Sequence, residues 1–80
     1  MKNIKAYYTE TNKLYVLKEI YTLNKSGIEV EEIDATTLPK PILTPSFVVF
    51  KKGGILSKLE GKHTPGIVLE WAQKHMKGAK

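Results

Sequence analysis

The stretch TPSFVVFKKGGILSKLEG, residues 44–61, contains the strongest fold signal in this chain of 80 residues. Its apolar run, residues 46–50, has no polar alternation, which is typical of an interior strand covered at least partly on both faces. Gly53 and Gly54 follow this run and predict a two-residue hairpin turn, because both positions of such a turn favour positive φ angles. Residues 55–61 then return as the second strand of the hairpin.

The first half of the chain predicts a strand, a helix and a second strand. Residues 4–9 alternate between more apolar and more polar side chains, the period of a strand with one apolar face. Asn12 is a candidate N-cap, and apolar side chains recur at helical spacing until Gly27, which predicts a helix over residues 13–25. Residues 27–35 alternate again and suit a half-buried strand at a sheet edge.

The segment between this strand and the hairpin is rich in proline. Pro39, Pro41 and Pro45 stand within seven residues, so a regular helix of more than one turn is not expected there. We predict a rigid connection between the two strands, which we call the arch.

The last segment predicts a second helix. Thr64 is a candidate N-cap, Pro65 suits the first helical position, and Gly78 marks the end. The apolar stripe of this helix comprises Ile67, Val68, Trp71, Ala72, His75 and Met76. The predicted order is therefore β-α-β, a linker and β-β-α, in one domain over residues 1–77 with a frayed tail at 78–80.

The composition excludes several classes of function. The chain has no cysteine, so no disulfide, thiolate or cysteine-based zinc chemistry is open to it. All 13 basic residues are lysines spread along the chain, so the net charge of +5 indicates a lysine-rich surface and makes a nucleic-acid partner unlikely. No apolar run approaches the roughly 20 residues that cross a bilayer, so we expect a cytoplasmic protein without a membrane partner.

The polar residues form no recognisable catalytic or metal-binding pattern. His63 and His75 have no further histidine or carboxylate at metal-ligand spacing, and we expect them at the surface or at a helix end. No serine has a nearby base in the sequence. Gly53 and Gly54 join two strands, whereas a phosphate loop joins a strand to a helix. The sequence therefore predicts neither a cofactor nor a metal.

The order of elements, with a Thr-Pro pair before a buried strand, resembles the thioredoxin-like superfamily and glutaredoxins in particular. The segment YYTETNKLYVLKE is similar to the glutaredoxin pattern Y-T-x-x-x-C-P-Y-C, in which Tyr8, Thr9 and Tyr15 match. The two cysteines of that pattern fall on Lys13 and Val16. The resemblance implies an α/β (α+β) fold with a four-stranded mixed sheet, two helices on one face, and the central helix shortened or lost.

The same resemblance implies a cis peptide bond between Thr44 and Pro45. In the family this site faces the two cysteines, and the backbone before the proline pairs with an extended peptide or with glutathione. From the sequence alone, a trans proline that merely starts the strand is the alternative, because only about 5% of X-Pro bonds in folded proteins are cis.

We interpret the chain as a redox-inactive thioredoxin-like or glutaredoxin-like module that binds a protein or peptide through the former active-site surface. The candidate binding residues are Thr11, Lys13, Leu14, Tyr15, Val16, Thr44 and Pro45. The positive charge of Lys13 favours an acidic partner. The alternative function is a divergent relative of the glutaredoxin-type thiol-disulfide oxidoreductases that donate electrons to ribonucleotide reductase. The small size, absence of arginine and altered motif also resemble phage or prophage accessory proteins.

Loss of the central helix predicts a sheet with one bare face. The side chains expected on this face are Lys5, Tyr7, Glu29, Glu31 and Lys58. Opposite charges on neighbouring strands can pair there, by about 0.2–1 kcal/mol each. Tyr7 and one of Val48 or Phe50 would form a contact patch on this face, unless they pack under the proline-rich arch.

Overall fold

The computed structural model describes residues 3–64 and 66–77. The elements along the chain are β1 (Asn3–Tyr8), α1 (Lys13–Lys25), β2 (Val30–Asp34), β3 (Ser46–Lys51), β4 (Gly54–Glu60) and α2 (Ile67–Lys77). Short 3-10 turns occupy Glu10–Asn12 and Ala35–Thr37. The predicted order of strands and helices is confirmed, whereas Pro65 and the predicted frayed tail lie outside the described residues.

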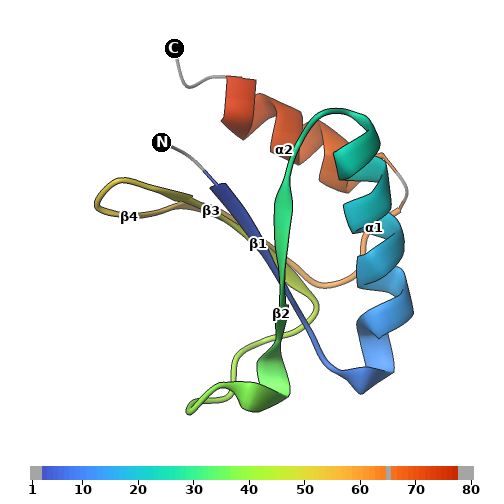
Figure 1. Ribbon diagram of the computed structural model, residues 1–80, viewed down its shortest axis with the longest axis vertical. Coiled ribbons are helices and arrows are strands. Elements are labelled where there is room, and N and C mark those ends of the chain that lie inside the picture. The colour runs from blue at the N-terminus through green and yellow to red at the C-terminus, as the bar shows by residue number, and fades with distance from the viewer. Residues whose placement is uncertain (1–2, 65, 78–80) are drawn as a thin grey trace.

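The four strands form one mixed, open sheet in the order β2-β1-β3-β4. β1 and β2 are parallel, and β3 is antiparallel to both of its neighbours, β1 and β4. Both helices pack on the same face of this sheet (Figure 1). The chain is therefore an α+β protein in which the predicted edge position of β2 and interior position of β3 are confirmed. Neither described helix has the length and apolar character needed to cross a membrane.

The hydrophobic core lies between the two helices and one face of β1 and β3. Alternate side chains of each strand reach it, because successive residues of a strand face opposite sides of the sheet. Its buried members are Ile4, Ala6, Val16, Ile20, Leu23, Phe47, Val49, Val68 and Ala72. Trp71 packs against this core from α2, as predicted, and its Nε1 donates a hydrogen bond of 3.1 Å to Ser57 Oγ on β4.

The apolar stripe predicted for α2 is wrong at Ile67, which is exposed. Its side chain is 41% exposed, although Val68 and Ala72 on the same helix are fully buried. Successive residues of an α-helix are rotated by about 100°, so a helix whose buried line runs through Val68 and Ala72 turns Ile67 to its flank.

β2 begins at Val30, later than the alternation from residue 27 predicts. Gly27 adopts a φ of 85°, and its N–H donates to the Asn24 carbonyl at 3.0 Å. The N–H of Ile28 donates to the Leu23 carbonyl, also at 3.0 Å. These two bonds complete the end of α1, because the last carbonyls of a helix need donors from the residues that follow it. Residues 27 and 28 are therefore used by the helix terminus before the strand begins.

The hairpin between β3 and β4 turns one residue earlier than the Gly-Gly pair predicts. Its two turn residues are Lys52 and Gly53, and Gly54 opens β4 opposite Lys51. Among the described residues only glycines have a positive φ, so Gly53, with a φ of 97°, supplies the one turn position that needs it. The register shifts at Val49 and Phe50 as in a β-bulge, which leaves Leu56 without a direct partner on β3.

The linker between β2 and β3 contains a single 3-10 turn, Ala35–Thr37, and no α-helix. Asp34 stabilises this turn, since its Oδ1 accepts hydrogen bonds from the N–H of Thr36 at 3.0 Å and from the Thr36 hydroxyl at 2.6 Å. The prediction that this region holds at most one helical turn is confirmed. The face of the sheet opposite α1 and α2 therefore has no helix on it in the described part of the chain (Figure 1).

Two identical substitutions on α1 test this placement of the core. Leu23→Ala removes a side chain that is fully buried, and we expect it to lower the free energy of unfolding by about 2–5 kcal/mol. Leu14→Ala removes a side chain that is 79% exposed, and we expect a change within about 0.5 kcal/mol. Urea denaturation followed by circular dichroism measures both. Equal losses in the two variants would contradict the described orientation of α1.

Candidate functional site

The N-terminal end of α1 is joined to the loop before β3 by the side chain of Asn12. Its Oδ1 accepts a hydrogen bond of 2.8 Å from the Thr9 N–H, and its Nδ2 donates one of 3.2 Å to Thr44 Oγ1. Asn12 does occupy the predicted N-cap position of α1, but its side chain makes no capping hydrogen bond to that helix. The amide instead connects two segments that are 32 residues apart in the sequence. Only 7% of Asn12 is exposed, so this connection is shielded from water.

Tyr15 connects the same end of α1 to the segment between β4 and α2. The N–H of His63 donates to Tyr15 Oη at 2.9 Å, and the tyrosine hydroxyl donates in turn to the His63 carbonyl at 3.5 Å. The His63 ring lies against the end of β4, with Nε2 at 2.9 Å from the Glu60 carbonyl. From the sequence we expected His63 at the surface or at a helix end. Its contact with Tyr15 could not be anticipated, because the backbone of His63 makes it.

The structure brings most of the predicted binding residues to one end of the molecule. Thr11, Lys13 and Leu14 are exposed, and Tyr15 and Thr44 are half-buried. We call these five residues the helix-tip surface. They surround the start of α1, and Thr44 reaches it through the bond to Asn12.

Two predicted binding residues are buried beneath this surface. Val16 has no exposed area and belongs to the core, so its inclusion as an accessible binding residue is corrected. Its position one residue after Tyr15 rotates it by about 100° around α1, toward the sheet. Pro45 is also buried, and its carbonyl accepts a hydrogen bond of 2.8 Å from the Gly61 N–H. The peptide bond between Thr44 and Pro45 is cis, as the resemblance implied.

Lys13 is not an isolated positive charge. Hydrogen bonds from Thr36 hold the pKa of Asp34 below its usual value, and the charge of Lys13 lowers that pKa further. Asp34 ends β2 and lies in the sheet beside Tyr8 of β1, whose chain leads directly into α1. The helix-tip surface, which includes Lys13, is therefore bordered by the carboxylate of Asp34.

Burial affects two ionisable groups on α1. It raises the pKa of the Tyr15 hydroxyl, although the hydrogen bond from His63 opposes this and the charge of Glu19 adds to it. Burial also raises the pKa of Glu19. A tyrosine hydroxyl keeps its proton at neutral pH even without such a shift, so Tyr15 acts there as both a hydrogen-bond donor and an acceptor.

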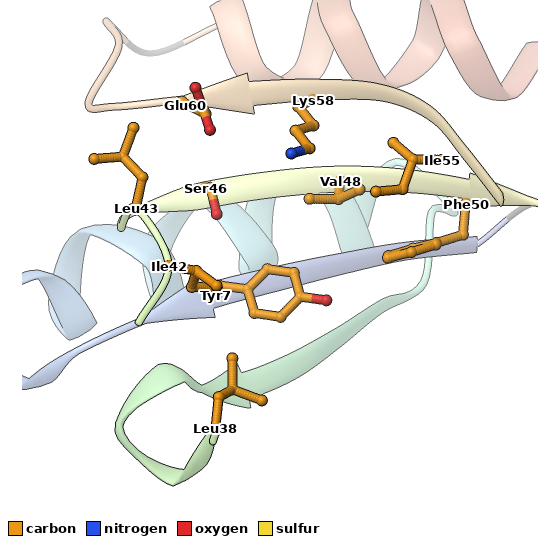
Figure 2. Close-up of a pocket in the computed structure, with 10 residues that line it drawn as sticks. All are labelled: Tyr7, Leu38, Ile42, Leu43, Ser46, Val48, Phe50, Ile55, Lys58 and Glu60. Carbon is orange, nitrogen blue, oxygen red and sulfur yellow. The ribbon is translucent and has the colours of Figure 1, made fainter. Parts of the chain in front are cut away.

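A second candidate site lies on the face of the sheet that the helices leave bare. A cleft of about 380 Å³, which we call the open-face cleft, lies above β1, β3 and β4. Figure 2 shows the residues that line it. Its floor comprises Tyr7, Ser46, Val48, Phe50 and Ile55. Leu38, Ile42 and Leu43 approach it from the arch, and Lys58 and Glu60 approach it from β4.

The open-face cleft corrects the patch predicted from the sequence in two respects. Both Val48 and Phe50 line it, whereas only one of them was expected, because residues 46, 48 and 50 of a strand share one face. The arch contributes to the cleft without filling it, since Leu43 remains 61% exposed. Lys5, one of the charged residues expected on this face, has its Nζ 5.0 Å from the centre of the Phe50 ring.

Sequence reasoning missed the contribution of the arch to this cleft. Leu38, Ile42 and Leu43 lie between or beside the prolines of a segment expected only to be a rigid connection. Three large aliphatic residues in a short exposed linker were the available signal, because such residues need either a core or a partner to cover them.

Comparison with known proteins assigns the chain to no family. No family model matches the sequence, and no curated protein matches it.

Over residues 3–64 and 66–77, no group of three histidine, aspartate or glutamate side chains is placed to hold a metal ion. The functional argument therefore depends on the two surfaces described above.

The bond between Asn12 and Thr44 predicts an energetic coupling between the helix-tip residues. We expect Asn12→Ala to lower the free energy of unfolding by about 1–3 kcal/mol, because it leaves the Thr9 N–H and the Thr44 hydroxyl without their partner. Thr44→Val removes one end of the same bond, so the double variant should lose less than the sum of the single variants. Urea denaturation of all four proteins measures the coupling. Strict additivity would show that the bond contributes nothing.

Asp34 predicts a pH dependence of stability. Because its pKa is lower in the folded than in the unfolded chain, the carboxylate stabilises the fold above the unfolded pKa of about 3.9. This contribution is lost as the pH falls through the lower, folded value. Asp34→Asn keeps the acceptor for Thr36 but removes the charge, so the difference in stability from the parent should shrink as the medium becomes acidic. A difference that stays constant from pH 7 to pH 2.5 would contradict the shift.

Proposed function

We propose that this chain is a thioredoxin-like protein without thiol chemistry, which binds a protein or peptide segment at the helix-tip surface. The α+β sheet order and the placement of both helices on one face are compatible with that family's arrangement. The cysteine positions of the glutaredoxin pattern hold Lys13 and Val16, and no residue of the chain is a cysteine. Disulfide exchange needs an attacking thiolate, so the alternative of an oxidoreductase has no nucleophile in these 80 residues.

The observation that carries the proposal is the convergence of three segments on the start of α1. Asn12 binds Thr44 ahead of β3, and Tyr15 binds His63 after β4. Segments held by hydrogen bonds form a surface of fixed shape, which reduces the entropy that a binding site loses when its partner docks. Leu14 projects from this surface with 79% of its area exposed. Leu14 lines one hollow together with Tyr15 and the exposed Tyr21, and a group of exposed apolar side chains at a hollow suits contact with a partner.

The charges at this surface define the partner's chemistry. Lys13 is exposed and favours an acidic group, whereas Asp34 competes for the same lysine. An extended segment that places an apolar side chain on Leu14 and a carboxylate near Lys13 would complement both residues. We therefore propose an acidic peptide segment with at least one large apolar residue as the partner.

Peptide binding by charge-changed variants tests this function. An array of ten-residue peptides with varied aspartate, glutamate and leucine content provides ligands, and fluorescence anisotropy measures their affinities. We expect Lys13→Glu and Tyr15→Ala each to weaken binding of acidic, leucine-containing peptides by about tenfold, in the range of an interface hot spot. Asp34→Asn should strengthen binding of the same peptides, since it frees Lys13.

Lys74→Glu is the matched control, because it makes the same charge change at an exposed position of α2. It should leave the peptide affinities unchanged. Binding that responds equally to Lys13→Glu and Lys74→Glu would indicate nonspecific attraction to a basic protein and would contradict the proposal. Thiol-dependent turnover of a disulfide substrate by the pure chain would also overturn it.

A further inference from the structure

The open-face cleft is independent of the proposed function, because it lies on the other side of the sheet from the helices. Six large apolar side chains are exposed in the described part of the chain, and three of them line this cleft: Ile42, Leu43 and Ile55. Apolar residues scattered singly on a surface need no explanation, but several that line the same hollow do. The volume of about 380 Å³ falls in the range of roughly 300–1,000 Å³ found for small-molecule sites.

The two charged residues that line the cleft, Lys58 and Glu60, both lie on β4. Figure 2 shows Lys58 extending over β3 near Val48, with Ile55 on one side of it along β4 and Glu60 on the other. The pairing of Val48 with Lys58 places the ammonium group above the apolar floor. Lys58 is exposed, and among the described residues it has neither a hydrogen bond nor an ion pair. The Lys58 ammonium group is therefore available to form a charge-assisted hydrogen bond with an anion that enters the cleft.

The sign of the charge along the floor selects the ligand. Lys5 lies over the ring of Phe50, with its Nζ 5.0 Å from the ring centre, so a second positive charge borders the same floor. Glu60 lies at the opposite end, beside Leu43 of the arch (Figure 2). An anion is therefore favoured near Lys58 and Phe50 and disfavoured near Glu60.

We propose that the open-face cleft binds an amphipathic organic acid. Its carboxylate pairs with Lys58, and its aliphatic or aromatic body packs on Tyr7, Val48, Phe50 and Ile55. The arch residue Leu43 covers the ligand from the side. This arrangement gives the Lys58 ammonium group a partner and removes exposed apolar area of Leu43 and Ile55 from water, at about 25 cal/mol for each Å² buried.

Octanoate and 1-octanol test the site, because they share an apolar body and differ in charge. Titrations into ¹⁵N-labelled protein, followed by two-dimensional NMR, should shift the amide signals of β3 and β4. We expect octanoate to bind about tenfold more tightly than 1-octanol, a difference of about 1.4 kcal/mol. Lys58→Met should remove this preference and leave the affinity for 1-octanol unchanged. Glu60→Gln should strengthen octanoate binding, because it removes the opposing charge.

Lys52→Met is the control, since it makes the same change at an exposed turn residue outside the cleft. It should preserve the preference for octanoate, and native-like spectra establish that each variant is folded. Equal affinities for acid and alcohol, or a preference that survives Lys58→Met, would overturn the proposal. Shifts confined to residues outside the cleft, or no shifts, would also overturn it. A dimer detected by sedimentation, with the open-face cleft buried between its two copies, would also overturn the proposal.

Discussion

Two short helices cover only one face of a four-stranded sheet, and most other features of the molecule follow from this unequal coverage. The interior strand β3 is apolar on both sides, with Phe47 and Val49 buried under the helices and Val48 and Phe50 on the opposite face. A strand with two apolar faces needs two covers, because exposed apolar area costs free energy in water. The helices supply one cover, and the proline-rich arch supplies only part of the other.

The arch can be short because of the strand directions. β2 and β3 run in opposite directions, so the chain leaves one strand and enters the other at the same end of the sheet. Asp34 organises the first turn of the arch through Thr36, and Asn12 binds Thr44 near its other end. The same segment therefore borders both candidate sites. Leu43 belongs to the open-face cleft, and its neighbour Thr44 belongs to the helix-tip surface.

The two surfaces differ in their chemistry, which suggests different ligands. The helix-tip surface is built on hydrogen bonds made by Asn12 and Tyr15, and it presents Lys13 and Leu14 to solvent. The open-face cleft is mostly apolar, and one exposed lysine, Lys58, approaches it from β4. A polypeptide segment suits the first surface, and a small amphipathic acid suits the second. A chain without cysteine can combine both, since neither kind of binding requires a thiolate.

The sequence by itself determined the order of the elements, the edge and interior strands, and the limits of α1, because these depend on local periodicity and on Pro and Gly. It also located the helix-tip residues through a motif. Only the tertiary structure decided which of them are accessible: Val16 is buried although Leu14, two residues earlier, is largely exposed. The roles of Asn12 and His63, the turn at Lys52 and Gly53, and the open-face cleft were likewise decided by contacts between segments distant in sequence. Periodicity describes one element at a time, whereas these features require the positions of several elements at once.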